Sequence, residues 1–213
     1  MRHPLFARCY ARLSPALERA TAAQRQPLLA GLSGRVIEIG AGTGTNFAYY
    51  PAAVTEVVAV EPEPHLRRAA KRAARAAEVD ITVVDGTAER LPAGAARFDA
   101  AVASLVLCTV DDQQLALAEL YRALRPGGQL RFFEHVAAGS AALRRLQVVV
   151  DRTLWPHLFG GCHTSRDTLS AITAAGFEVE RVEPVSLPFG PASPHILGVA
   201  SRPAGPSVRE TTS

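Results

Sequence analysis

Three glycines, spaced two residues apart, directly follow a short apolar run, and no other segment restricts the fold of this chain as strongly. The apolar run Arg35–Ile39 is predicted to be a β-strand, and it leads into Gly40, Gly42 and Gly44. Glycine is needed where the backbone turns sharply and approaches a ligand with no Cβ in the way. A strand that ends in such a loop is typical of nucleotide-binding α/β sheets, although single glycine turns occur in many other proteins.

Short apolar runs alternate with longer amphipathic segments along much of the chain. This alternation predicts parallel strands joined by crossover helices. We therefore expect an α/β fold of Rossmann-like type, with a seven-stranded, mainly parallel sheet and helices on both faces. The strands are expected at 35–39, 57–60, 81–84, 98–104, 129–134, 177–183 and 195–201, and the helices at 64–77, 113–124, within 143–155 and at 165–174.

The length of 213 residues suits one α/β domain. We expect a single domain over residues 1–203, of which 1–33 form a helical cap over the ligand site. Residues 204–213 lack an apolar period and are expected to be a disordered tail. Leu5, Phe6 and Leu13 share one face of the predicted first helix, with Arg8 and Arg12 near another. A peripheral membrane contact is therefore the alternative to the cap.

The positive charge of the chain does not indicate a nucleic-acid partner. The formal net charge is +3, Lys71 is the only lysine, and the arginines are dispersed along the chain. A nucleic-acid binder would be expected to gather its cations on one face with aromatic residues between them, and aromatic residues make up only 6% here. We expect no nucleic acid among the partners, and the oligomeric state stays open.

The cysteines and the apolar runs indicate a cytoplasmic protein. Cys9, Cys108 and Cys162 form neither a CxxC pair nor an even disulfide set, so free thiols in a reducing compartment are expected. No apolar stretch reaches the roughly 18 residues of a transmembrane helix, and residues 1–30 lack the apolar core of a signal peptide. No spacing of histidines and carboxylates suggests a metal site.

Two polar motifs follow the next strands. Glu61 comes directly after the second predicted strand, where a carboxylate can accept hydrogen bonds from two ribose hydroxyls. Residues 85–89 (Asp-Gly-Thr-Ala-Glu) follow the third strand, where backbone amides could contact an adenine ring. A dinucleotide-binding loop would require glycine at position 45, which is Thr45. The three motifs together favour a nucleoside-containing cofactor other than NAD or FAD.

From Val36 to Phe133 these motifs resemble the class I methyltransferases that use S-adenosylmethionine (SAM). The resemblance implies SAM as cofactor and methyl transfer as the reaction. It implies that Glu38 and the glycine loop hold the methionine end of SAM, that Glu61 binds the ribose, that residues 86–88 line the adenine, and that Ser104 and Leu105 lie beneath the sulfonium. The expected cofactor-binding residues are Glu38, Gly40, Ala41, Gly42, Gly44, Asn46, Glu61, Pro62, Gly86, Thr87, Ala88, Ser104 and Leu105.

A narrower resemblance covers most of the chain and concerns the methyltransferase-like proteins that include the alkyl thiol S-methyltransferases of animals. It implies a small apolar acceptor, with a thiol favoured, but the hydrophobic membrane anchor of those animal proteins has no counterpart in this sequence. The matching segments are 46–47, 50–51, 104–110, 133–136, Trp155, 161–162, 164–168 and 194–198.

Direct displacement requires little of the enzyme beyond holding the acceptor near ~3 to 3.5 Å from the methyl carbon. His135 follows the fifth predicted strand and is the candidate base or acceptor-orienting group, with a hydrogen-bonded structural histidine as the alternative. Cys108 and Cys162 are interpreted as small buried apolar groups. His163 and His195 could line the acceptor pocket, and a turn or surface position is the other interpretation.

Several functions remain open from the sequence. Within the methyltransferases, the acceptor could be an oxygen, nitrogen or carbon atom of a small metabolite or quinone. An NAD-dependent oxidoreductase is the hypothesis from another class, and Thr45 argues against it. A non-catalytic protein with a decayed cofactor loop is the third, and the intact glycines argue against it.

Overall fold

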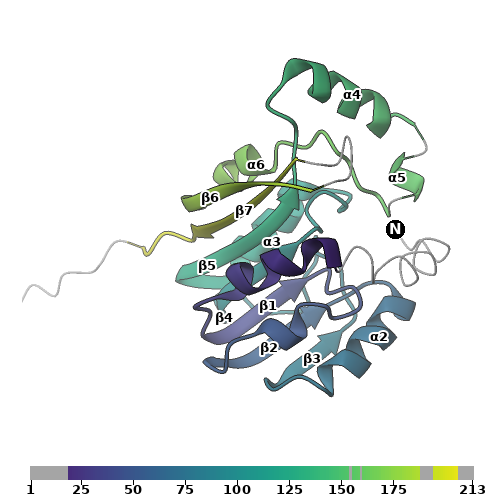
Figure 1. Ribbon diagram of the computed structural model, residues 1–213. Helices are drawn as coiled ribbons and strands as arrows, with labels where there is room; N and C mark the ends of the chain where they lie inside the picture. Colours follow the sequence, from purple (N-terminus) through teal and green to yellow (C-terminus); the bar gives the residue numbers. More distant parts are fainter. Residues whose placement is uncertain (1–18, 154, 159, 188–193, 206–213) are drawn as a thin grey trace, which may run out of the picture.

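A seven-stranded sheet organises the chain (Figure 1). The structure is a computed structural model, and it describes residues 19–153, 155–158, 160–187 and 194–205. The strand order is β3-β2-β1-β4-β5-β7-β6. The strands are β1 (Gly34–Ile39), β2 (Val54–Val60), β3 (Ile81–Val84), β4 (Phe98–Ser104), β5 (Leu124–His135), β6 (Glu178–Ser186) and β7 (Pro194–Ser201).

The sheet is parallel except at one strand. The pairs β1–β2, β2–β3, β1–β4 and β4–β5 are parallel, whereas β7 runs antiparallel to both β5 and β6. The strand order reverses between β1 and β4, and in open α/β sheets ligands bind outside the carboxyl ends of the strands at such a point. The predicted fold class and the number of strands are confirmed.

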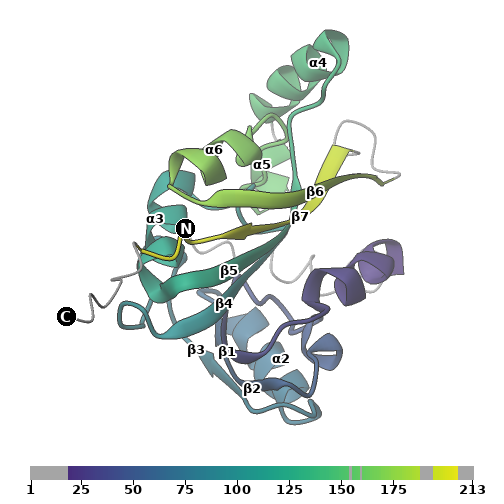
Figure 2. The same cartoon turned by 90° about the vertical axis from the view of Figure 1, so that its left-hand side faces the viewer.

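Helices cover both faces of the sheet (Figure 2). A helix over residues 19–29 and α2 pack on one face, where Leu28, Leu29 and Ala70 join a core with the strands. On the other face, α3 and α6 bury Leu117 and Ile172. α4 and α5 stand beyond the carboxyl end of β5 (Figure 1). The labelled helices are α2 (Pro64–Ala74), α3 (Gln113–Ala123), α4 (Ala141–Asp151), α5 (Trp155–Leu158) and α6 (Thr168–Ala174), with the short 3-10 helix η1 (Phe47–Tyr49) after the glycine loop.

Capping side chains set the helix boundaries. The predicted helix 165–174 begins only at Thr168, because the Asp167 carboxylate caps it by accepting from the Ser170 amide at 3.1 Å. The predicted helix 64–77 ends at Ala74. The helical pattern within 143–155 corresponds to two helices, of which α4 begins after the cap Ser140. The differences concern ends of elements, not their type.

The expected N-terminal cap and C-terminal tail lie partly outside the described residues. Within the cap, residues 19–29 are helical, while the apolar face that could contact a membrane (Leu5, Phe6 and Leu13) is not described. Of the tail, only residues 204 and 205 are described. A search of the described helices finds none with the length and apolar character needed to span a bilayer.

Candidate active site

The glycine loop turns sharply at the carboxyl end of β1. Gly40, Gly42 and Gly44 all have positive φ, at +59°, +59° and +84°. A Cβ on Gly40 would overlap the Val106 side chain, and one on Gly44 would lie 2.7 Å from the Phe47 ring. Glycine is therefore required at both positions by conformation and by packing. The contact at Gly40 brings this loop against the turn that follows β4.

A buried carboxylate holds the loop from beneath. Glu38, which is 2% exposed, accepts hydrogen bonds from Asn46 Nδ2 at 2.8 Å and from the Tyr50 hydroxyl at 2.7 Å. Arg25, from the helix over 19–29, donates to Asn46 Oδ1 at 2.5 Å. Burial raises the pKa of Glu38 to about 7, although the two hydrogen bonds and the Arg25 charge oppose this rise. Glu38 and Asn46 thus tie the loop to the N-terminal helix.

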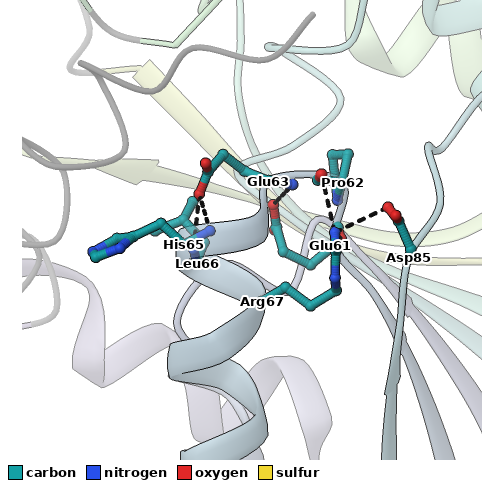
Figure 3. Close-up of polar contacts among 7 residues, drawn as sticks. All are labelled: Glu61, Pro62, Glu63, His65, Leu66, Arg67 and Asp85. Atoms are coloured by element: carbon teal, nitrogen blue, oxygen red, sulfur yellow. Dashed lines mark hydrogen bonds and ion pairs between the residues drawn. The ribbon is translucent and has the colours of Figure 1, made fainter.

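Glu61 lies at the adjacent strand end, beside the glycine loop. Its carboxylate, 4% exposed, accepts from the Gly42 amide at 2.8 Å and from the Glu63 amide at 2.9 Å. Burial raises the pKa of Glu61 to about 7, against the lowering effect of these two hydrogen bonds. Figure 3 shows the Glu61 side chain folded back toward the Glu63 amide at the start of α2.

Arg67 joins the ends of β2 and β3 (Figure 3). Its Nη1 donates to the backbone oxygens of Glu61 at 2.8 Å and Pro62 at 3.0 Å, and forms an ion pair with Asp85 at 2.9 Å. Sequence reasoning missed this role, because Arg67 is one of five cationic residues on the predicted helix and nothing in its spacing distinguishes it. Its cross-strand contacts appear only once the two strand ends are adjacent.

The third turn, after β3, lies close to the second. A Cβ on Gly86 would lie 2.9 Å from Pro92 Cδ and 3.0 Å from a Val60 methyl group, so this residue is glycine for packing. Thr87 pairs with Arg90 in an isolated bridge, and Ala88 is buried in the core. The structure therefore places the three predicted segments at the carboxyl ends of β1, β2 and β3, which are adjacent strands.

The turn after β4 is held by Glu134, which lies in the matching segment 133–136 but has no predicted role. Leu105 has a positive φ of +57°, and its amide donates to the Phe133 carbonyl at 2.7 Å. The fully buried Glu134 carboxylate accepts from three successive amides, those of Val106 and Leu107 at 3.0 Å and that of Cys108 at 3.2 Å. An acidic residue within an otherwise apolar strand end was the available signal.

Beside this turn, the fold assembles a cluster of two thiols and an imidazole, here called the Cys–His cluster (Cys108, His135 and Cys162). One potential ligand atom from each residue lies within 4.8 Å of the other two. His135 Nδ1 is 3.5 Å from Cys162 Sγ. The His135 ring also stacks on His195, with centroids 5.1 Å apart, so His195 is a buried neighbour of the candidate base and not a surface residue.

The two thiols of the cluster have opposite pKa shifts. The hydrogen bond with Cys162 and burial raise the pKa of Cys108 well above its usual value. Hydrogen bonds from Cys108 and His135 lower the pKa of Cys162 to about 5, although burial opposes this. The expectation that both cysteines are simple apolar groups misses this arrangement, because residues 27 positions apart carry no sequence signal of proximity.

The arrangement fits a nucleoside-containing cofactor. The glycine loop lies at the end of β1, the buried Glu61 carboxylate lies at the end of β2, and a turn of small residues (86–88) lies at the end of β3. Thr43 Oγ1, within the loop, is buried and has no hydrogen-bond partner among the described residues, as expected of a group that a ligand would satisfy.

Comparison with known proteins decides the family. Residues 37–132 match the family model described as a methyltransferase domain. The chain is 34% identical over 179 residues to thiol S-methyltransferase TMT1B of Mus musculus, and the match covers 81% of this chain and 73% of the mouse protein. The chain belongs to the SAM-dependent methyltransferase family. The resemblance seen in the sequence is confirmed, and the enzyme class and the cofactor SAM follow from it.

Other methyltransferases share the sequence or the fold. The C-methyltransferase UbiE of ubiquinone and menaquinone biosynthesis from Syntrophotalea carbinolica is 35% identical over 143 residues, 65% of this chain and 59% of that protein. A crystal structure of a SAM-dependent methyltransferase from Mesorhizobium loti matches with a TM-score of 0.65 and 20% identity, covering 86% of this chain and 98% of that one. The latter similarity establishes the fold. The oxidoreductase and the non-catalytic hypotheses are set aside.

Proposed function

We propose that this methyltransferase transfers the methyl group of SAM to the sulfur of a small apolar thiol by direct in-line displacement. The observation that carries the proposal is the 34% identity to a thiol S-methyltransferase over 81% of the chain. The Cys–His cluster supports it, because the cluster lies where β4 and β5 end, next to the turn that contacts the glycine loop.

In this proposal the three turns hold SAM. Gly40, Ala41, Gly42 and Gly44 surround the methionine end, and Glu38 and Asn46 support them. Glu61 and Pro62 contact the ribose, residues 86–88 the adenine, and Ser104 and Leu105 the region beneath the sulfonium. The adjacency of these segments at one edge of the sheet supports the assignment.

SAM supplies a methyl group on a positively charged sulfur, which is already a good leaving group. The protein's residues have to orient the acceptor, exclude water and take up the acceptor's proton. Ionising a thiol of pKa ~8.5 at pH 7 costs about 2 kcal/mol, against about 4 for a phenol near ~10. A thiol therefore needs only modest assistance.

His135 is the proposed base or acceptor-orienting group. It is 2% exposed, and its Nε2 has no hydrogen-bond partner among the described residues. A buried ring nitrogen of this kind can accept a proton or a hydrogen bond from an acceptor beside it. We expect His135→Gln to leave the Kd for SAM unchanged and to lower kcat, as measured by calorimetry and by turnover; unchanged turnover would remove His135 from the mechanism.

The acceptor is tested by a panel assay. Purified protein, SAM and a set of alkyl thiols, phenols, quinones and amines would be incubated, and methylated products and S-adenosylhomocysteine measured by mass spectrometry. We expect methyl thioethers from the alkyl thiols. Turnover confined to a quinone carbon would instead favour the activity named for the UbiE relative. Glu56→Gln, at a half-buried position near the amino end of β2 where Glu56 pairs with Arg35, serves as the control for His135→Gln.

A further inference from the structure

The Cys–His cluster draws its three residues from separate elements, and each residue is held in place by contacts of its own segment. Cys108 follows β4, and its amide is held by Glu134 at 3.2 Å. His135 ends β5 and is stacked on His195. Cys162 belongs to the segment between α5 and α6. The convergence of three groups that are 27 residues apart in sequence therefore results from the fold and not from local chain geometry.

The segment that carries Cys162 is anchored on both sides. The His163 amide donates to the Cys108 carbonyl at 2.9 Å, and the Thr164 and Ser165 amides donate to the Asp151 carboxylate at 2.6 and 2.9 Å. Gly161, at φ +92°, has no room for a side chain, because a Cβ would lie 2.8 Å from the Thr109 carbonyl oxygen. These contacts hold the Cys162 thiol against Cys108 and His135.

Two sulfurs and one imidazole nitrogen form a donor set of defined chemistry. Thiolate and imidazole ligands together suit Zn²⁺, at about 2.3 Å for sulfur and 2.0 to 2.1 Å for nitrogen in a tetrahedral site. Such bond lengths separate neighbouring ligand atoms by roughly 3.5 Å. The observed separation of 3.5 Å between His135 Nδ1 and Cys162 Sγ matches this geometry, and all three ligand atoms lie within 4.8 Å of one another.

The geometry points to a Zn²⁺ site made by Cys108, His135 and Cys162, with its fourth position open to the acceptor thiol. The role of the fourth position rests on the proposed function, whereas the three-ligand site does not. Three protein ligands and one exchangeable position are the usual composition of catalytic zinc sites. Cys108 and His135 are buried, whereas Cys162 is partly exposed.

With zinc bound, the metal and not His135 ionises the acceptor, because a thiol that coordinates zinc is deprotonated. His135 then orients the acceptor as a ligand of the metal. The acceptor S–H bond breaks as a Zn–S bond forms, and the proton leaves to solvent. A sulfur electron pair then attacks the methyl carbon, while the bond from that carbon to the sulfonium breaks and leaves its electrons on S-adenosylhomocysteine. The product is a neutral thioether, a weak ligand that dissociates. Full ionisation of a thiol of pKa ~8.5 would raise its reactive fraction by up to about 30-fold at pH 7.

Metal content tests the site without reference to activity. The full chain would be purified without chelator and its zinc measured by mass spectrometry after exhaustive desalting, and Co²⁺ would be exchanged in to record the sulfur-to-cobalt absorption of a tetrahedral site. We expect about one zinc per chain, lost in Cys162→Ser and in His135→Gln. His65→Gln, at an exposed position of α2, serves as the matched control that retains it.

Two measurements keep the outcomes distinct. Calorimetry with SAM checks that each variant remains folded and binds cofactor, so that zinc loss is not mistaken for unfolding. Absence of zinc from wild-type protein, or a disulfide between Cys108 and Cys162 in its place under reducing purification, would overturn the site. Zinc bound without turnover of any thiol would retain the site and reject the thiol acceptor. Equal thiol turnover by zinc-free protein would reject the role of the metal and leave the thiol methyltransferase standing.

Discussion

Glu61 is a buried carboxylate that accepts few hydrogen bonds. Its two oxygens accept from the amides of Gly42 and Glu63, and burial raises its pKa to about 7. A ribose diol donates two more hydrogen bonds to such a carboxylate and favours its ionised form, so SAM binding should lower this pKa and release a proton. The free protein below pH 7 holds that proton, which opposes binding.

We therefore expect the Kd for SAM to be constant above about pH 8 and to rise as the pH falls below 7, by at most about tenfold per pH unit. Glu61→Gln should weaken binding by about 1.5 to 3 kcal/mol at pH 8, the value of hydrogen bonds to a charged group. It should also flatten the pH profile, leaving only the contribution of Glu38, whose pKa burial also raises to about 7. Calorimetry between pH 6 and 8.5 measures both, and an unchanged pH slope in the variant would show that Glu61 does not bind the ribose.

Single residues were predictable where they repeat a local pattern. The glycines of the loop and Glu61 follow apolar runs at a fixed distance, so the sequence identifies them and their order. Arg67 and Glu134 could not be identified in this way. Each acts on backbone atoms of another strand, and the contact exists only after the sheet has formed.

The turn after β4 is an element whose conformation depends on one side chain. Glu134 accepts from three buried amides, and each buried N–H without a partner costs about 1 to 3 kcal/mol. Glu134→Ala should therefore reduce the free energy of unfolding by about 3 kcal/mol or more. Glu134→Gln keeps one acceptor oxygen, so it should cost less.

Denaturant titration monitored by circular dichroism measures both changes. Glu178→Ala, at an exposed position on β6, is the matched control, and its effect should stay within about 0.5 kcal/mol. A loss of under 1 kcal/mol in Glu134→Ala would show that water or a rearranged turn replaces the carboxylate.

Elements were predictable in type and order because their apolar periods differ. Their ends were not, because side-chain caps decide them. Asp167 starts α6 three residues later than the apolar pattern suggests, and the carboxylate of Glu63 fixes the start of α2 by accepting from two amides. The sequence contains several residues of the capping types, but it does not show which of them caps a given helix.

At the scale of the molecule, β7 is the strand that joins β6 to the rest of the sheet. Gly198 lies at its centre, where a Cβ would overlap the Phe132 ring and lie 2.6 Å from the Arg181 carbonyl oxygen. Gly198→Ala should lower the free energy of unfolding by about 1 to 3 kcal/mol through overpacking. The Kd for SAM should not change, because β7 is separated from β1 by β4 and β5.

Chemical denaturation and calorimetry on the same preparation check the two parts of this prediction. Gly139→Ala is the matched control, because a Cβ there meets nothing within 4 Å. If Gly198→Ala weakens SAM binding as strongly as it destabilises the fold, the antiparallel end of the sheet and the cofactor edge are coupled, and the prediction is wrong.

The overall architecture could be predicted from the sequence, whereas the Cys–His cluster could not. Parallel topology follows from alternating strands and helices, and it places successive strand ends at one edge. The meeting of Cys108, His135 and Cys162 depends on how the segment between α5 and α6 returns toward the β4 turn, through bonds such as that from His163 to Cys108. No local period encodes that path.

The bond from Arg25 to Asn46 gives the helix over residues 19–29 a second role. Asn46 also donates to Glu38 beneath the glycine loop, so order in the loop and order in the helix share one set of hydrogen bonds. Linkage of this kind is reciprocal: the free energy by which a bound ligand stabilises the helix equals the free energy by which the ordered helix strengthens ligand binding. Ligand binding at the loop is therefore expected to stabilise the helix over residues 19–29, and stabilising this helix is expected to strengthen ligand binding.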